Sequence, residues 1–167
     1  MPLGSCRECG GQVSLQAVAC PHCGAPYPSR PDWRGFGVDW RTKASLGGYP
    51  LVHVAFGRDA SGRRRVARGV VAVGQWAVGV VTIAQFGIAY VIGVGQFVLG
   101  PIVVAQFALA LVLGLGQFAT GVIAIGQVAA GWYVFALWGA GHHVWTATVQ
   151  DPQAVAFFRR LGDAVKW

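Results

Sequence analysis

The chain has 167 residues, of which 54% are hydrophobic, 11% are charged and 25 are glycine. A typical soluble domain has about 25% charged residues and about 7% glycine, so this composition excludes an ordinary globular enzyme and a polar disordered chain. The length allows one domain with a small module beside it.

The formal net charge of +7 is unevenly distributed along the chain. Residues 1–68 hold ten basic and four acidic residues, whereas residues 69–150 hold no Asp, Glu, Lys or Arg. A basic head before an uncharged body favours an anionic partner for the head, either a phospholipid surface or a nucleic acid. The first residues lack the basic start and apolar core of a signal peptide, so we expect a location in the cytoplasm or on the cytoplasmic face of a membrane.

All four cysteines lie within residues 6–23 as two CxxC pairs, Cys6 with Cys9 and Cys20 with Cys23. A glycine follows each pair, where a tight turn needs a positive φ angle. Two such turns that face each other place four thiolates in a tetrahedron, which suits a structural Zn²⁺ ion and leaves no open position for catalysis. The alternatives are two disulfides, which a reducing compartment disfavours, and a redox-active CxxC, which needs only one pair.

In these motifs residues 6–23 resemble the zinc-ribbon family. The resemblance implies a structural zinc site on a short β-hairpin, and members of the family bind nucleic acid, proteins or no evident partner. The ten residues between the two motifs include no basic or aromatic side chain, which disfavours recognition of nucleic acid. We therefore expect residues 1–25 to be a zinc module that docks to a protein partner.

Residues 26–48 are predicted to be a linker that begins with three prolines. Trp33, Phe36 and Trp40 then stand among basic residues. Such a mixture is typical of a membrane interface or of a stacking surface for single-stranded nucleic acid. The simpler alternative is a segment whose aromatic side chains pack on the next domain.

Residues 51–68 predict a β-hairpin, with a strand over residues 51–56, a turn at 58–62 and a return strand from 63. The turn and the return strand carry five arginines: Arg58, Arg63, Arg64, Arg65 and Arg68. In a membrane protein, arginines beside an apolar body contact anionic headgroups on the cytoplasmic side, whereas in a soluble protein they form a solvated turn. His53 is predicted to be an ordinary strand residue, since no second ligand motif accompanies it.

An internal repeat dominates residues 49–150. Glutamines recur at intervals that alternate between 10 and 11 residues, at Gln75, Gln85, Gln96, Gln106, Gln117 and Gln127. Within each five-residue unit, bulky residues alternate with Ala, Gly or Thr, and this period of two is typical of strands. We therefore predict an all-β domain with glutamines at its corners and a full period of two glutamine intervals. Either a closed barrel with one hairpin per period or a solenoid with one coil per period, about 21 residues in each case, fits this pattern.

The alternative for the same segment is three transmembrane helices. The uncharged run is long enough for three spans of about 20 residues, and the glutamine spacing also fits three helical turns. Against helices, no polar loop interrupts the run, and the recurrent glycines lower helix propensity. The β prediction is therefore preferred.

The repeat also resembles a group of bacterial repeat proteins of the predicted β-flower type. Residues 51–58, 68–75 and 117–121 carry this resemblance. It implies a shallow barrel with hairpin petals, and it implies no established activity.

Residues 151–167 are predicted to form an amphipathic helix that begins at Asp151 and Pro152. Its apolar stripe is Val155, Phe158, Leu161 and Val165, which suits either a membrane interface or a lid on the repeat domain. Before the helix, His142 and His143 are adjacent. On a strand they would point to opposite faces, which disfavours a metal site.

No nucleophile and base pair is visible, and the uncharged body has no carboxylate or lysine for acid–base chemistry, so we do not expect an enzyme. Three functions fit the sequence. The first is a membrane- or lipid-associated binding or scaffold protein with a zinc docking module, whose apolar body contacts lipid or another hydrophobic ligand. The second is a soluble protein that binds nucleic acid through its basic head. The third is a structural homo-oligomer built from stacked repeat bodies.

Overall fold

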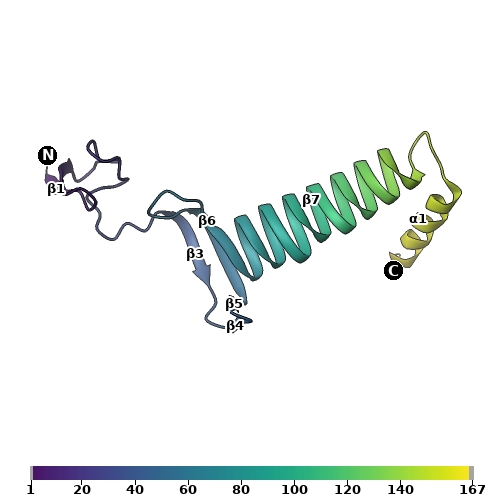
Figure 1. Cartoon of the computed structure of the whole chain (residues 1–167), viewed down its shortest axis with the longest axis horizontal. Helices are drawn as coiled ribbons and strands as arrows, with labels where there is room; N and C mark the ends of the chain where they lie inside the picture. The colour runs from purple at the N-terminus through teal and green to yellow at the C-terminus, as the bar shows by residue number, and fades with distance from the viewer. Residues whose placement is uncertain (1, 166–167) are drawn as a thin grey trace. The chain divides into compact units, whose positions relative to one another are not determined.

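The computed structural model describes residues 2–165 (Figure 1), with the side chain of Val165 excepted. The chain divides into two compact units. The first combines Met1–Gly37 with Gly57–Arg64, and the second combines Val38–Phe56 with Arg65–Trp167. The positions of Lys166 and Trp167, at the end of the predicted helix, lie outside the described residues.

The first unit is built around a short hairpin. Strand β1 (Leu3–Ser5) pairs antiparallel with β2 (Gln12–Ser14), and Leu3 lies opposite Ser14. The small core of this unit is Cys6, Val13, Cys20 and Ala25, so two of the four cysteines are core residues. A separate aromatic cluster joins Tyr27, Trp33 and Phe36, with ring centroids 4.5 to 5.3 Å apart. Three aromatic residues of the predicted linker thus pack within the first unit.

Short strands precede the repeat. Strand β3 (Phe36–Arg41) is followed by β4 (Ser45–Leu46) and β5 (Tyr49–Pro50), which form an antiparallel hairpin closed by two glycines with positive φ angles. Strand β6 (Val52–Arg58) lies between β3 and β7 (Val66–Trp145) in a sheet.

The predicted hairpin over residues 51–68 does not form as expected, because β6 and β7 pair parallel, from Val52 opposite Val71 to Ala55 opposite Gly74. An isolated antiparallel bridge between Arg58 and Arg64 closes the turn, but the chain then continues into a coil. The chain completes this coil before it lies beside β6. A strand that returns after a full coil runs in the same direction as the strand beside it, so the pairing is parallel. Strand β6 is therefore the first rung of the repeat domain.

The repeat is a narrow β-solenoid. Strand β7 is 80 residues long and winds as one continuous coil (Figure 1). Residues one glutamine interval apart are neighbours in successive turns. The rings of Trp76, Phe86, Phe97, Phe107 and Phe118 form a ladder with centroid distances of 4.7 to 6.2 Å. Glycines face carbonyl groups of the preceding coil at the same spacing in sequence. Gly100, for example, faces the carbonyl group of Ala89.

The structure thus confirms the all-β class and resolves the alternatives. Each coil spans one glutamine interval rather than the predicted two, because each turn has two corners and glutamine marks only one of them. The alternative prediction of three transmembrane helices is wrong, since residues 66–145 form a strand. The shallow barrel with hairpin petals is also not what this segment forms, because β7 is continuous from Val66 to Trp145.

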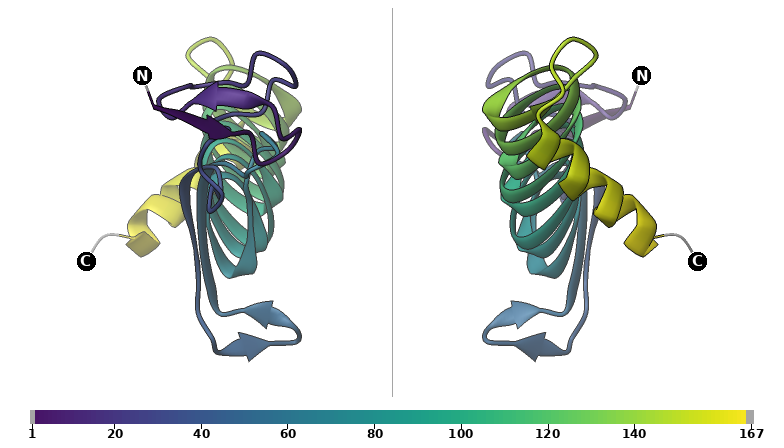
Figure 2. Two further views of the ribbon diagram at one scale, coloured as in Figure 1. Left: turned by 90° about the vertical axis from the view of Figure 1, so that its left-hand side faces the viewer. Right: turned by 90° about the vertical axis from the view of Figure 1, so that its right-hand side faces the viewer.

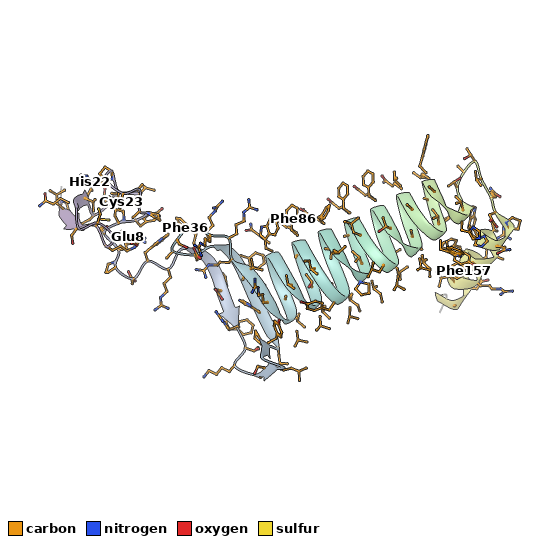
Figure 3. All side chains as sticks on the ribbon, viewed as in Figure 1. Glu8, His22, Cys23, Phe36, Phe86 and Phe157 are labelled. Atoms are coloured by element: carbon orange, nitrogen blue, oxygen red, sulfur yellow. The ribbon has the colours of Figure 1, made fainter. Side chains whose placement is uncertain are left out.

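Mostly small side chains fill the inside of the coil, and the largest that are fully buried there are Val98, Val103 and Val134. In the turn over residues 77–86, the buried residues are Ala77, Gly79, Thr82 and Ala84. Two consecutive residues point outward at each corner, as Gln85 and Phe86 do, and Figure 3 shows Phe86 directed away from the coil axis. Figure 2 shows the coil end-on as a narrow loop with two sides. The space between the sides holds one layer of side chains no larger than valine, so most of the bulky residues lie outside.

Helix α1 (Pro152–Val165) follows the coil, which confirms the predicted C-terminal helix. The Asp151 carboxylate accepts a hydrogen bond of 2.7 Å from the Gln153 N–H, as a helix N-cap does. Ala154 and Phe158 are buried, and the Phe158 ring lies 5.5 Å from Phe135 at the end of the solenoid. The first half of α1 therefore packs on the last coils, whereas Leu161 is 38% exposed.

Candidate metal centre and the outer surface of the coil

Four cysteine thiols converge in the first unit. All four Sγ atoms lie within 4.8 Å of one another, and Cys6–Cys23 and Cys9–Cys20 are each 3.7 Å apart. Tetrahedral thiolates at about 2.3 Å from a Zn²⁺ ion would lie about 3.8 Å from each other. The cysteines are free rather than joined by disulfides. The predicted ligand set is thus positioned to bind one metal ion and is compatible with zinc.

The backbone builds the same turn twice. The Gly10 N–H donates to the Cys6 carbonyl and the Gly24 N–H to the Cys20 carbonyl, both at 2.9 Å. Gly10 and Gly24 have φ angles of 73° and 74°, as the spacing of the motifs predicted. These two turns bring the two thiols of each pair close together. His22, between two of the cysteines, is exposed.

The thiols differ in their affinity for protons. Hydrogen bonds from the backbone, that of Cys9 first, lower the pKa of Cys6 to about 6. For Cys23 the Ala25 N–H lowers the pKa, but burial and the neighbouring thiols outweigh it and raise the pKa to about 12. Four thiols at this separation cannot all lose their protons without a cation to balance their charge. A divalent metal ion would offset part of that charge.

The five predicted anion-binding arginines do not share one environment. Arg58, Arg63 and Arg64 belong to the first unit, whereas Arg65 and Arg68 belong to the second. Arg65 is largely buried and pairs with Asp39 at 2.8 Å, so its charge is already compensated. The side chains of Arg63, Arg64 and Arg68 are exposed, where an anionic surface can reach them.

A polar network at the start of the coil was not predicted. The Arg68 backbone N–H donates to His53 Nδ1 at 2.8 Å, so His53 Nε2 carries the proton and donates to Asp39 Oδ1 at 3.1 Å. Burial would raise the pKa of Asp39, but His53 and the Arg65 guanidinium outweigh it and hold that pKa below its ordinary value of 3.8. His53 is thus a buried strand residue that joins β3 to the first coil. No local sequence motif predicts this network, because the residues that form it are far apart in the sequence.

The six repeat glutamines are all exposed and recur at the same corner of successive coils. The aromatic ladder follows them directly along the chain at all but the last position, where Val128 follows Gln127. The remaining corner and both flat sides carry apolar residues. Examples that are between 37% and 68% exposed are Val80, Ile83, Ile88, Tyr90, Val94, Leu99, Val104, Leu111, Val122 and Phe135. The solenoid therefore presents an uncharged and mainly apolar surface on every side.

An apolar groove interrupts this surface near the end of the coil. In the earlier coils, one row of outward positions is occupied by large aliphatic residues. In the later coils the same row is occupied by Thr120, Ala130 and Ala140. The result is an apolar groove of about 540 Å³, bounded by rings that include Phe118 and Trp138. Its apolar lining suits a hydrocarbon chain.

The two adjacent histidines do not point to opposite faces, as a regular strand would require. His142 and His143 occupy a corner of the last coil, where consecutive residues both point outward, and their rings lie 4.5 Å apart. His143 Nδ1 is 3.0 Å from the Asp151 carboxylate, and this hydrogen bond, together with that from the Gln153 N–H, lowers the pKa of Asp151. His143 thus helps to hold the start of α1.

No protein-family model, no curated protein and no solved structure matches this chain. Within residues 2–165 no helix is both long and apolar enough to cross a membrane.

Proposed function

We propose that this is a non-enzymatic, membrane-associated binding or scaffold protein. In this proposal the outer surface of the solenoid contacts lipid, and the four-cysteine module holds a structural zinc ion and docks to a protein partner. The observation that carries the proposal is the outward orientation of the bulky residues around an uncharged coil. An exposed apolar patch on a soluble monomer rarely exceeds a few hundred Å², whereas this surface continues along the whole of β7.

The backbone of a solenoid also suits a lipid environment. Each turn lies beside the turn before it and the turn after it, so the strand N–H and C=O groups find partners within the chain. A backbone N–H or C=O group without a partner costs several kcal/mol in hydrocarbon. Only structures that pair these groups within the chain therefore tolerate a lipid environment. The coil meets this requirement without any help from water.

Flotation tests the association with lipid. We expect the purified protein to rise with anionic vesicles in a density gradient and to stay with them after an alkaline carbonate wash. A protein that stays at the bottom of the gradient as a stable homo-oligomer would instead show that copies of the chain cover the apolar surface.

A charge substitution makes the test specific to the coil. Val104 lies near the middle of β7 and is 45% exposed, so Val104→Arg fits the fold sterically. An arginine that faces hydrocarbon costs about 2.5–3.5 kcal/mol, so the variant should lose membrane retention. Val18→Arg, at an exposed site in the first unit, is the matched control and should float like the wild type. Equal retention of the two variants would contradict the proposal.

Metal analysis tests the zinc module separately. We expect one zinc ion per chain after purification under reducing conditions, and its loss on Cys20→Ser. His22→Ala, which removes an exposed neighbour of the ligands, should keep the ion. A zinc content near zero in the wild-type protein would overturn the assignment.

A further inference from the structure

Several features of the solenoid bear on how it would sit in lipid. Its apolar residues lie on both flat sides and at both corners, so the coil is not amphipathic in cross-section. A coil that lay flat on a membrane would leave about half of this surface in water. Only surroundings of lipid on all sides bury the whole surface.

The length of the coil matches the thickness of a bilayer. At one glutamine interval a coil, the 80 residues of β7 make between seven and eight coils. Neighbouring strands are about 4.8 Å apart, so these coils rise about 35 Å along the axis. The hydrocarbon core of a bilayer is about 30 Å thick. The uncharged residues 69–150 cover almost the same part of the chain.

Both ends of the coil carry residues that suit a membrane–water interface. At the start, Arg68 is exposed, and the nearby Trp40 and Tyr49 are about half exposed. At the other end, Trp132 and Trp138 are 54% and 79% exposed, and the exposed Arg159 and Arg160 follow on α1. Between residues 77 and 131 the only Trp or Tyr is Tyr90. Trp and Tyr concentrate at interfaces, and arginines contact headgroups.

The open edges of the solenoid are covered as well. Strand β6 pairs with the first coil, and β3 pairs with β6. At the other end Gln150 forms a bridge with Trp145, and α1 packs on the rings of Tyr133 and Phe135. Strand edges that still lack a partner therefore lie only at the two ends of the solenoid. There, lipid headgroups and water can form hydrogen bonds with their N–H and C=O groups.

We infer that the solenoid crosses the bilayer as a single coil with its axis along the membrane normal, so that Arg68 and α1 lie on opposite sides. This inference rests on the proposed association with lipid and adds the orientation. The partner of the apolar surface is then the acyl chains of both leaflets. The glutamine corner forms one polar stripe across the membrane.

Trypsin offers a direct test, because residues 69–158 contain no Lys or Arg and cannot be cut. All tryptic sites therefore lie at the two ends of the coil. In sealed vesicles that contain the full-length protein, external trypsin should remove either the basic head or the residues after Arg159 from each molecule, but not both. After the vesicles are dissolved in detergent, both ends should be cut. Mass spectrometry of the protected fragments distinguishes these products.

Cleavage of both ends of the same molecule in sealed vesicles, or protection of both ends, would overturn the transmembrane orientation. The proposed function would survive that result, because flotation and carbonate resistance are measured separately. Polarised infrared spectra of oriented bilayers give an independent check. Strand C=O groups lie along the coil axis, so their amide I absorption should be polarised along the membrane normal, and polarisation in the membrane plane would contradict the inference.

Discussion

At the scale of single residues, Asp39 is the centre of the contacts that hold the start of the coil. Its carboxylate accepts from His53, pairs with Arg65 at 2.8 Å and lies 3.6 Å from Arg41. Because His53 accepts the Arg68 N–H, the network joins β3, β6 and the first turn of β7. Loss of the carboxylate would remove an acceptor that two largely buried side chains, His53 and Arg65, share.

We predict that Asp39→Asn destabilises the second unit by about 1.5–3 kcal/mol at neutral pH, the usual value of a hydrogen bond to a charged group. The pKa of Asp39 is lowered in the folded protein, so its contribution is complete above the ordinary value of 3.8 and is lost as the pH falls below it. The gap in thermal midpoint between wild type and variant, followed by circular dichroism, should therefore narrow steadily as the pH is lowered below 3.8. The exposed Asp32→Asn is the control, and a gap that persists in acid would contradict the ion-pair explanation.

At the scale of elements, the glycines of the repeat allow the coils to approach each other. A Cβ atom on Gly116 would overlap the carbonyl oxygen of Ala105 in the preceding coil, and backbone cannot move aside as a flexible side chain can. Alternation of small and large residues is therefore a condition for stacking as well as for a narrow interior.

We predict that Gly116→Ala destabilises the solenoid by about 1–3 kcal/mol, as overpacking of a core does. Gly162→Ala is the matched control, since nothing lies within 4 Å of its Cβ position in α1 and alanine favours a helix by up to about 1 kcal/mol. Thermal unfolding of both variants by circular dichroism measures the difference. Equal midpoints of thermal unfolding for the two variants would show that neighbouring coils lie farther apart than in the structure.

Helix α1 depends on its cap. Asp151 accepts the Gln153 N–H and also bonds His143 in the last coil. We predict that Asp151→Ala costs about 1 kcal/mol of helix stability, and that trypsin in detergent then cuts at Arg159 and Arg160 about five times faster. Gln153→Ala leaves the cap in place and should keep the wild-type rate. An unchanged rate for Asp151→Ala would show that packing on Phe135 alone holds the helix.

At the scale of the whole molecule, the number of coils sets the apolar length of the solenoid. Deletion of residues 86–106 removes two glutamine intervals and joins Gln85 to Phe107, so the sequence at the glutamine corner is unchanged. The coil should shorten by about 10 Å. We predict that the deleted protein partitions into vesicles of short-chain lipid in preference to long-chain lipid, since mismatch costs a fraction of a kcal/mol per Å.

The control for this deletion is the removal of residues 86–90, which is half a coil. It places the remaining glutamines at the opposite corner and should abolish folding rather than change the lipid preference. A full-period deletion with the lipid preference of the wild type would show that the length of the coil does not determine how it sits in lipid.

The sequence by itself determined the features that depend on local pattern. The CxxC spacing predicted the convergent thiols, the alternation of bulky and small residues predicted strand, and Asp151 with Pro152 predicted the helix start. Alternation defines two faces of a strand but does not say which face is inside. The tertiary structure decided that, because a coil that closes within one glutamine interval has room only for side chains up to the size of valine. It also decided the parallel pairing of β6 with β7 and the contact of Asp39 with His53 and Arg65, since these depend on where the chain returns after a full turn.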